Sequence, residues 1–351
     1  MVMRKLQQPN EAMKEIELAI KMDTEGWHLL MIKAKILASQ KKWQEAIDVM
    51  NLSNQILEGD SARMKKHIDD YWENKLFVAE WHHDLKQYDQ ALESYHSCLE
   101  HDPDDYNLLP PTLEIWLEKD DSSGAMRFIR ELNEAKAAKS GHSRLAHAVI
   151  ALRDEASFHF DIFQTAQQNQ ELELIQATYN QALSIATSKN RRGQVAWMQY
   201  LLGILFERYL SQRDDAMNIW EKTISDSAKA VKGTGLFSAR NEVVCDLCNL
   251  YIEEVSQLGK DSPVAAKYIE KIKDIGTPDT SVLWQHDIAS VLSVLHRLLG
   301  EDEQAKKCFR SRVKVGFDLL TDKDPTVSAT DRNILEKVIT DLNHFPELQL
   351  I

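Results

Sequence analysis

The chain has 351 residues, of which 43% are hydrophobic and 28% are charged, with 12 Gly and 8 Pro. This length exceeds what one hydrophobic core usually serves, so two or three units or one extended repeat array are expected. The apolar fraction excludes a disordered chain, and the low Gly and Pro content favours helices over a loop-rich all-β protein. The formal net charge of -13 argues against nucleic acid as a ligand, because its binders usually present a basic surface.

The compartment is indicated by the cysteines and by the longest apolar runs. Four cysteines are too few for a disulfide framework, which favours a reducing compartment. The first residues contain no apolar stretch of the kind a signal peptide needs. The longest apolar runs, such as 146–152, are far shorter than the ~20 residues of a membrane helix. We therefore predict a cytoplasmic protein that does not insert into a membrane.

A pattern of three residues recurs along the chain: a small residue, a large residue four positions later, and usually a small residue three further on. Because offsets of four and seven stay on one face of a helix, each set predicts a helix that packs on the helix before it. The first four leading alanines lie 34, 45 and 34 residues apart, and the later separations are 50, 41, 49 and 40. The sets are Ala12, Ile16 and Ala19; Ala46, Met50 and Ser53; Ala91, Tyr95 and Cys98; Ala125, Ile129 and Leu132; Ile175, Tyr179 and Ala182; Ala216, Trp220 and Thr223; Ala265, Ile269 and Ile272; and Ala305, Phe309 and Arg312.

The partner helices are predicted ahead of these sets. In chain order they cover residues 27–40, 72–86, 106–119, 194–211 and 281–299. The spacing of 45 contains 11 residues beyond 34, which is about three helical turns. Two interpretations stay open: one long helix over 62–86 with Ser61 as its N-cap, or a flexible linker at 57–61.

Three further helices are predicted outside this scheme. One long helix should cover about 144–167. The chain opens with a helix at 10–22 that has no partner before it, and it closes with an unpaired helix at about 328–343. Because solenoid ends normally carry polar caps, we expect either a longer array or association with another subunit.

The segment from Tyr88 to Pro103, YDQALESYHSCLEHDP, resembles the second helix of a tetratricopeptide repeat. The small and large residues of the 34-residue family signature correspond to Ala79, Ala91 and Tyr95, and its closing proline to Pro103. Trp43-Gln44-Glu45-Ala46 resembles the entry to the same helix. The resemblance implies an all-α fold, an α-solenoid in which antiparallel helix pairs stack into a right-handed superhelix.

The resemblance divides the chain into regions of different quality. We expect a single solenoid over 1–351, with well-matched repeats at 10–135, longer and degenerate repeats at 144–325, and an unpaired terminal helix at 326–351. Gly203 is similar to the family glycine of a first helix, although Ala216 is then one residue out of step. HEAT-like helix pairs are the alternative for the longer repeats.

Three features of the sequence could carry chemistry. Cys245 and Cys248 lack two further ligands at zinc-finger spacing, which favours helix packing over zinc. Glu155 and His159 lie four apart on one helix, and a solvated pair is favoured over a metal or acid–base site. The glycines at 233–235 are better explained as a turn between helices than as a phosphate loop. We expect a protein that is not an enzyme and binds no cofactor or metal.

The first helices of such repeats line a concave groove in proteins similar to this one. Among the inward positions Lys35 is the only Lys or Arg, whereas the family clamp for chaperone C-terminal tails uses several cations, so those tails are unlikely ligands. Acidic residues beside Leu76 and Leu117 suit a basic, amphipathic protein segment. A solvated acidic face without a ligand is the alternative. Aligned by the leading alanines, the inward positions are His28, Met31, Lys35, Glu73, Leu76, Glu80, His83, Asn107, Pro110, Glu114 and Leu117.

The sequence thus favours a non-catalytic scaffold or adaptor that binds protein segments in an acidic groove. The alternative is a regulatory sensor, or the C-terminal repeat region of a larger signalling ATPase. A zinc-dependent or hydrolytic enzyme is a third hypothesis, and stoichiometric zinc would be needed to support it.

Overall fold

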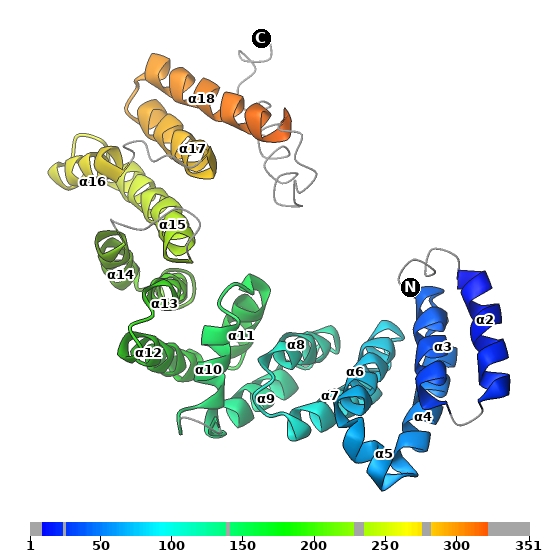
Figure 1. Ribbon diagram of the computed structural model, residues 1–351. Helices are drawn as coiled ribbons and strands as arrows, with labels where there is room; N and C mark the ends of the chain where they lie inside the picture. The colour runs from blue at the N-terminus through cyan, green and yellow to red at the C-terminus, as the bar shows by residue number, and fades with distance from the viewer. Residues whose placement is uncertain (1–8, 24–25, 138–140, 228–234, 276–281, 322–351) are drawn as a thin grey trace. The chain divides into compact units, whose positions relative to one another are not determined.

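The computed structural model describes residues 9–23, 26–137, 141–227, 235–275 and 282–321 (Figure 1). The regular elements of these residues are all helices, and one isolated antiparallel bridge joins Lys136 to Ser143. Consecutive helices pack as antiparallel pairs, such as those at 27–58 and 68–101. The predicted all-α fold of paired helices is therefore confirmed. The chain divides into two compact units, unit 1 (Met1–Thr178) and unit 2 (Tyr179–Ile351).

Unit 1 is a stack in which each helix pair packs on the next one. The second helix of one pair contacts the first helix of the following pair, as α4 does with α6 and α7 with α8. Its elements are α2 (Pro9–Met22), α3 (Trp27–Ser39), α4 (Trp43–Glu58), α5 (Ser61–Lys66), α6 (Ile68–Asp84), α7 (Tyr88–His101), η1 (Tyr106–Leu108), α8 (Leu109–Glu118), α9 (Ser122–Glu134), α10 (Arg144–Ala151) and α11 (Ala156–Gln168). Helix α12 (Leu172–Ser188) contains the division between the units.

Unit 2 continues with longer helices. Helices α13 and α14, α15 and α16, and α17 and α18 pack against each other in turn. Its elements are α13 (Arg192–Ile204), the π-helix η2 (Leu205–Tyr209), α14 (Arg213–Asp226), α15 (Gly235–Leu258), α16 (Pro263–Ile275), α17 (Val282–Leu298) and α18 (Asp302–Thr321). The predicted helix at 328–343 lies outside the described residues. A single solenoid over 1–351, its superhelical hand and its regions stay predictions.

The recurring three-residue pattern forms the core of both units. The leading residues Ala46, Ala91, Ala125 and Ala216 have no exposed surface, and the large residues four positions later are buried with them. A small side chain allows the preceding helix to approach closely, and the large one fills the space beside the contact. Three described positions depart from the pattern, because Ala12, Ala19 and Ile269 remain partly exposed.

Each of six turns between helices contains one residue in the left-handed backbone conformation, and none of these six residues is glycine. In five of them the next N–H donates to the carbonyl five residues back: from Lys42 to Leu37, from Gln87 to His82, from Asp121 to Trp116, from Glu171 to Ala166 and from Arg191 to Ala186. This is the Schellman ending of a helix. The residues with φ between 51° and 59° are Lys41, Lys86, Asp120, Gln170, Asn190 and Ser211.

The prediction of one long helix at 62–86 is wrong, because the helix is interrupted at His67. His67 has φ -120° and ψ 34°, and it ends α5 and begins α6. Its Nδ1 atom lies 3.0 Å from Oδ2 of Asp70, and its ring packs 4.9 Å from that of Trp27. The N-cap is Asp60 rather than Ser61, because its carboxylate accepts from the N–H groups of Ala62 and Arg63. The flexible linker at 57–61 is wrong too, since α4 extends to Glu58.

The long helix predicted at 144–167 is also interrupted. Helix α10 ends at Ala151 and α11 starts at Ala156. The Nε2 atom of His159, in α11, donates to the carbonyl oxygen of Leu152 at 3.0 Å. The same carbonyl oxygen accepts from the N–H of Glu155 at 2.8 Å, so a backbone donor and a side-chain donor both bind the end of α10. His159 is fully buried, whereas Glu155 is exposed, so the predicted solvated pair of these two residues is wrong.

The π-helix explains why Ala216 is out of step with Gly203. A π-helical turn holds one more residue than an α-helical turn. The extra residue falls between Gly203 in α13 and Ala216 in α14. Gly203 still lies against Trp220, and Ala216 is still buried in the core. One additional residue in the π-helix thus accounts for the step between Gly203 and Ala216.

Candidate functional site

The predicted groove residues come from α3, α6, η1 and α8 of unit 1. Lys35 in α3 does not act as a free cation, because its Nζ atom lies 3.5 Å from Oε1 of Glu73 in α6. The same ammonium group stands 4.3 Å above the ring of Phe77. The only predicted cation of the groove is therefore paired with one of its acids.

His83 in α6 is also engaged within the chain. Its Nε2 atom lies 3.0 Å from Oε2 of Glu118 at the end of α8. This hydrogen bond is the first cause of the lowered pKa of Glu118. The pair fixes the end of α6 against the end of α8.

The remaining predicted residues differ in exposure. Met31, Leu76, Pro110 and Leu117 are partly buried, and Met31 packs against the core of the first pairs. His28 is exposed on α3. Asn107 lies in the short helix η1 rather than on α8, and its amide donates to Asp105 at 3.1 Å. That these residues line a binding groove stays a prediction.

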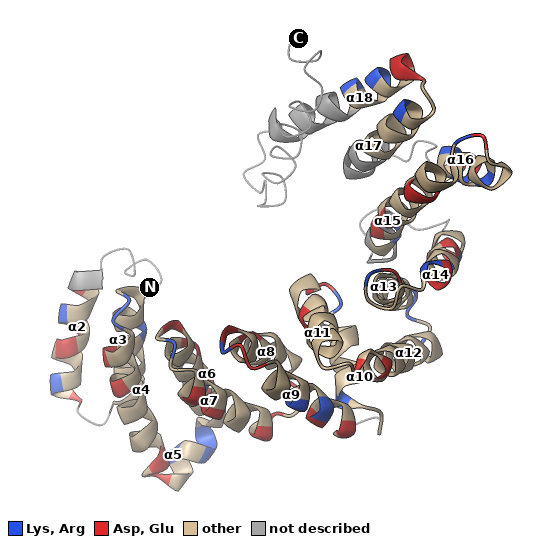
Figure 2. Cartoon of the chain, turned by 180° about the vertical axis from the view of Figure 1, so that it is seen from behind, with Lys and Arg blue, Asp and Glu red and all other residues tan. Residues whose placement is uncertain are grey.

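Four carboxylates form the acidic patch of unit 1: Glu80 and Asp84 in α6, Glu114 in α8 and Asp161 in α11. None of the four forms an ion pair with a described residue, as the ion pairs and the residues with other contacts show. Figure 2 shows acidic residues in red on α6 and α8, which belong to successive helix pairs.

The charges of the acidic patch act on one another. Desolvation raises the pKa of Glu80, and the charge of Asp84 raises it further. Desolvation also raises the pKa of Asp161, with a contribution from Glu114. Like charges raise each other's pKa only when they lie close together, so Glu80 lies near Asp84 on α6, and Asp161 of α11 lies near Glu114 of α8.

Sequence reasoning identified Glu80 and Glu114 but missed Asp84 and Asp161. Asp84 lies four positions after Glu80 and therefore on the same helix face, so Asp84 could have been predicted from the helical spacing. Asp161 was hidden by the predicted long helix at 144–167, which left no first helix to align after α8.

Neutralising a carboxylate of the acidic patch should stabilise the fold. A carboxyl group with a raised pKa in the folded state favours folding while it is protonated, and this contribution is lost as the pH rises through the folded pKa. At neutral pH we expect Glu80→Gln and Asp161→Asn to raise the free energy of unfolding by no more than about 1 kcal/mol, because solvent screens these partly exposed groups. Urea unfolding at pH 7 and at mildly acidic pH measures this, and the gain should shrink at the lower pH. If the two substitutions lower the free energy of unfolding equally at both pH values, the charged carboxylates of the patch do not destabilise the fold.

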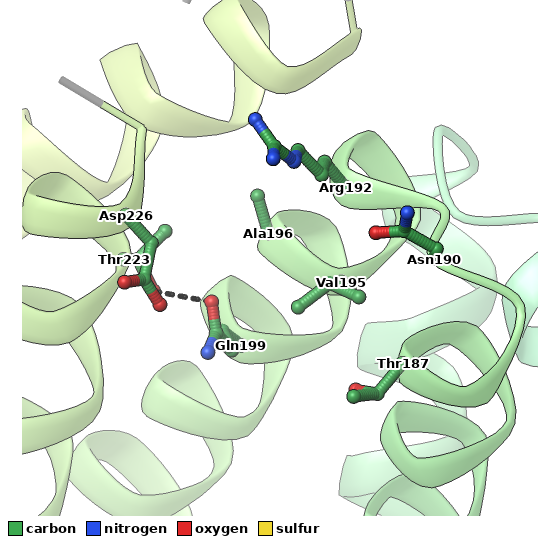
Figure 3. A pocket seen from close by; sticks show the side chains of 8 residues that line it. All are labelled: Thr187, Asn190, Arg192, Val195, Ala196, Gln199, Thr223 and Asp226. Atoms are coloured by element: carbon green, nitrogen blue, oxygen red, sulfur yellow. Dashed lines mark hydrogen bonds between the residues drawn. The ribbon is translucent and has the colours of Figure 1, made fainter. Parts of the chain in front are cut away.

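Unit 2 contains a polar pocket of ≈ 330 Å³ between α12, α13 and α14 (Figure 3). At its edge Thr223 donates to Oε1 of Gln199 at 3.0 Å, and both residues are buried. The charged residues of its lining are Arg192 and Asp226, so neither sign of charge dominates. The lining consists of Thr187, Asn190, Arg192, Val195, Ala196, Gln199, Thr223 and Asp226.

In the described part of the chain, no group of three or more His, Cys, Asp or Glu side chains is placed to hold a metal ion. Cys248 is buried in α15, and burial raises the pKa of its thiol to about 12, while Cys245 is partly buried on the same helix. Within these residues, no helix combines the length and the apolar character needed to cross a membrane. The turn predicted at Gly233 lies outside the described residues.

Comparison with known proteins yields structural likeness alone. No protein-family model and no curated protein matches the chain. A tetratricopeptide repeat protein from Parabacteroides merdae aligns over 89% of this chain and 98% of its own, with 12% identity and a TM-score of 0.33. BtubC (BKLC) from P. vanneervenii aligns over 93% of this chain and 96% of its own, with 12% identity and a TM-score of 0.30. The Naa15/Naa10 complex bound to HypK-THB aligns over 97% of this chain and 66% of the matched chain, with 12% identity and a TM-score of 0.19. These similarities are low and concern the helical fold only.

Proposed function

We propose that unit 1 is a non-catalytic protein-interaction module that binds a basic, amphipathic protein segment. The observation that carries the proposal is the acidic patch of Glu80, Asp84, Glu114 and Asp161, whose charges no cation of the described chain neutralises. Like charges held together raise the free energy of the unbound state, and a bound cation relieves this repulsion.

Apolar groups beside the patch supply the second part of the proposal. Leu76 in α6 and Leu117 in α8 are partly buried and keep some surface open to solvent. A segment with Lys or Arg beside apolar side chains would match both features, because charges set its register and the buried apolar area adds affinity.

Charge reversal tests the proposal. The probe is a short labelled amphipathic peptide of Lys and Leu, and its binding to the full chain is followed by fluorescence anisotropy. We expect Glu80→Lys with Glu114→Lys to weaken binding by about tenfold or more at low salt, because two attractive contacts become repulsive. High salt should reduce the difference in peptide affinity between parent and variant, because it screens the charges.

The matched control changes the same charge elsewhere in unit 1. Glu93→Lys with Glu131→Lys places two cations on exposed positions of α7 and α9, which are second helices of their pairs. This control should bind almost like the parent. Binding of the Glu80 and Glu114 variant at parental affinity in low salt would refute the acidic patch as the binding surface.

A further inference from the structure

The polar pocket of unit 2 lies along one face of α13, between the ends of α12 and α14 (Figure 3). Its volume of ≈ 330 Å³ falls within the range of about 300–1,000 Å³ that small-molecule sites occupy. In Figure 3 the end of α14, with Asp226, lies on one side of this face, and the end of α12, with Thr187, lies on the other. The residues of α13 that line the pocket are spaced by three or four positions and therefore share this face: Arg192, Val195, Ala196 and Gln199.

Gln199 lines the pocket with an amide group that is only partly satisfied. The residue is almost completely buried, with 4% of its surface exposed. Its Oε1 atom accepts from the hydroxyl group of Thr223 at 3.0 Å, whereas its Nε2 atom donates to no described residue. A buried N–H group without an acceptor costs free energy. A ligand that places an oxygen atom beside Gln199 would satisfy this donor.

Two opposite charges line the same pocket without pairing. Arg192 is the first residue of α13, and Asp226 is the last residue of α14. The helix dipole disfavours a cation at the first position and an anion at the last. Neither side chain forms an ion pair or a hydrogen bond with a described residue. Each charge therefore weakens its own helix, and no contact within the described chain compensates for this.

A ligand that carries both signs of charge would explain this arrangement. An anionic group beside Arg192 would interact with the guanidinium group and with the positive end of α13, whose start has no side-chain cap. A cationic group beside Asp226 would interact with the carboxylate and with the negative end of α14. A simple anion or cation would use only one of the two charged side chains.

We propose that this pocket binds a free α-amino acid with an oxygen atom in its side chain. Arg192 pairs with the α-carboxylate, Asp226 pairs with the α-ammonium group, and Nε2 of Gln199 donates to the side-chain oxygen. Unit 2 contains every residue of the pocket, so the site is independent of the function proposed for unit 1. Charge reversal in the acidic patch should not affect it.

Calorimetric titration of the full chain with each proteinogenic amino acid tests the proposal. We expect at least one amino acid with a side-chain oxygen to bind with a Kd of ~1 mM or tighter. Arg192→Gln and Asp226→Asn should each weaken this binding about tenfold or more, because each removes a charge-assisted hydrogen bond. The controls Arg191→Gln and Asp215→Asn remove exposed charges that do not line the pocket, and they should bind like the parent.

Derivatives of the bound amino acid assign each charge to its partner. N-acetylation removes the ammonium charge, and conversion of the α-carboxylate to an amide removes the negative charge. Both derivatives should bind the parent chain more weakly than the free amino acid. The N-acetyl derivative should not distinguish Asp226→Asn from the parent, and the amide should not distinguish Arg192→Gln from the parent, because the interaction is already lost.

Thermal unfolding separates a loss of binding from a loss of folding. Without ligand, the Tm of Arg192→Gln and of Asp226→Asn should equal or exceed that of the parent, because each substitution removes a charge from a helix end that disfavours it. The amino acid should raise the Tm of the parent more than that of either variant. Three results would overturn the site: no amino acid binds with a Kd of ~1 mM or tighter, the derivatives bind as well as the free amino acid, or the controls lose as much affinity as the variants.

Discussion

Replacing Gly203 with Ala should lower the Tm of unit 2 by roughly 10 °C, which corresponds to about 3 kcal/mol for a unit of this size. A Cβ atom at this position would lie 1.9 Å from Nε1 and 2.3 Å from Cε2 of Trp220. Trp220 is 1% exposed, and its Nε1 atom donates to the carbonyl oxygen of Tyr200 at 3.2 Å. The indole cannot move away without losing this bond and the packing of α14 on α13. Thermal unfolding followed by circular dichroism measures the effect.

A matched glycine shows whether the clash causes the loss. Gly59 ends α4 with φ -69°, and a Cβ atom there would come no closer than 3.4 Å to a neighbouring carbonyl oxygen. Gly59→Ala should leave stability unchanged or raise it by up to about 1 kcal/mol, because Ala restricts the unfolded chain.

A double-mutant cycle identifies the partner of Gly203. Trp220→Leu alone costs several kcal/mol through the cavity it leaves. Adding Gly203→Ala to it should cost much less than in the parent, because the indole that meets the new methyl group is gone. Additive losses would show that Trp220 is not the obstacle.

Features that depend on one helix face could be predicted from the sequence. Except at Ala12 and Ile269, the leading residues and the large residues four positions later are buried, because the period of a helix fixes their direction. Glu80 and Glu114 were placed on the first helices for the same reason. These predictions needed only spacing along one element.

Features that depend on contacts between elements could not be predicted. At the break at His67 the imidazole contacts the carboxylate of Asp70, and at the break after Ala151 the side chain of His159 binds the carbonyl of Leu152, seven residues earlier. The pairing of Lys35 with Glu73 depends on how closely α3 and α6 approach. The left-handed turn residues, such as Lys41, are not glycine, so the sequence does not mark their conformation. The pairing of Lys35 was missed because it is a tertiary contact, whereas the helix breaks and turns depend on local hydrogen bonds that the hydrophobic pattern does not show.

His159 should make the folded chain sensitive to acid. It is fully buried in α11, and desolvation lowers its pKa from 6.5 to about 4, an effect that its bond to Leu152 only partly opposes. The unfolded chain binds a proton on this imidazole below pH ~6.5, whereas the folded chain does so only near pH ~4. Stability is therefore complete above the unfolded pKa and is lost as the pH falls toward the folded pKa. The loss from this group is on the order of 3 kcal/mol.

His159→Gln should remove this part of the acid sensitivity. The Gln amide can still donate to the carbonyl of Leu152, but it does not titrate. Urea unfolding between pH ~7 and ~4.5 should show a shallower fall of the free energy of unfolding in the variant, by up to about 1.4 kcal/mol per pH unit. His28→Gln, which replaces an exposed histidine of α3, should keep the slope of the parent. Parallel pH profiles for His159→Gln and the parent would mean that the imidazole is hydrated in the folded chain, and that the turn between α10 and α11 opens to solvent.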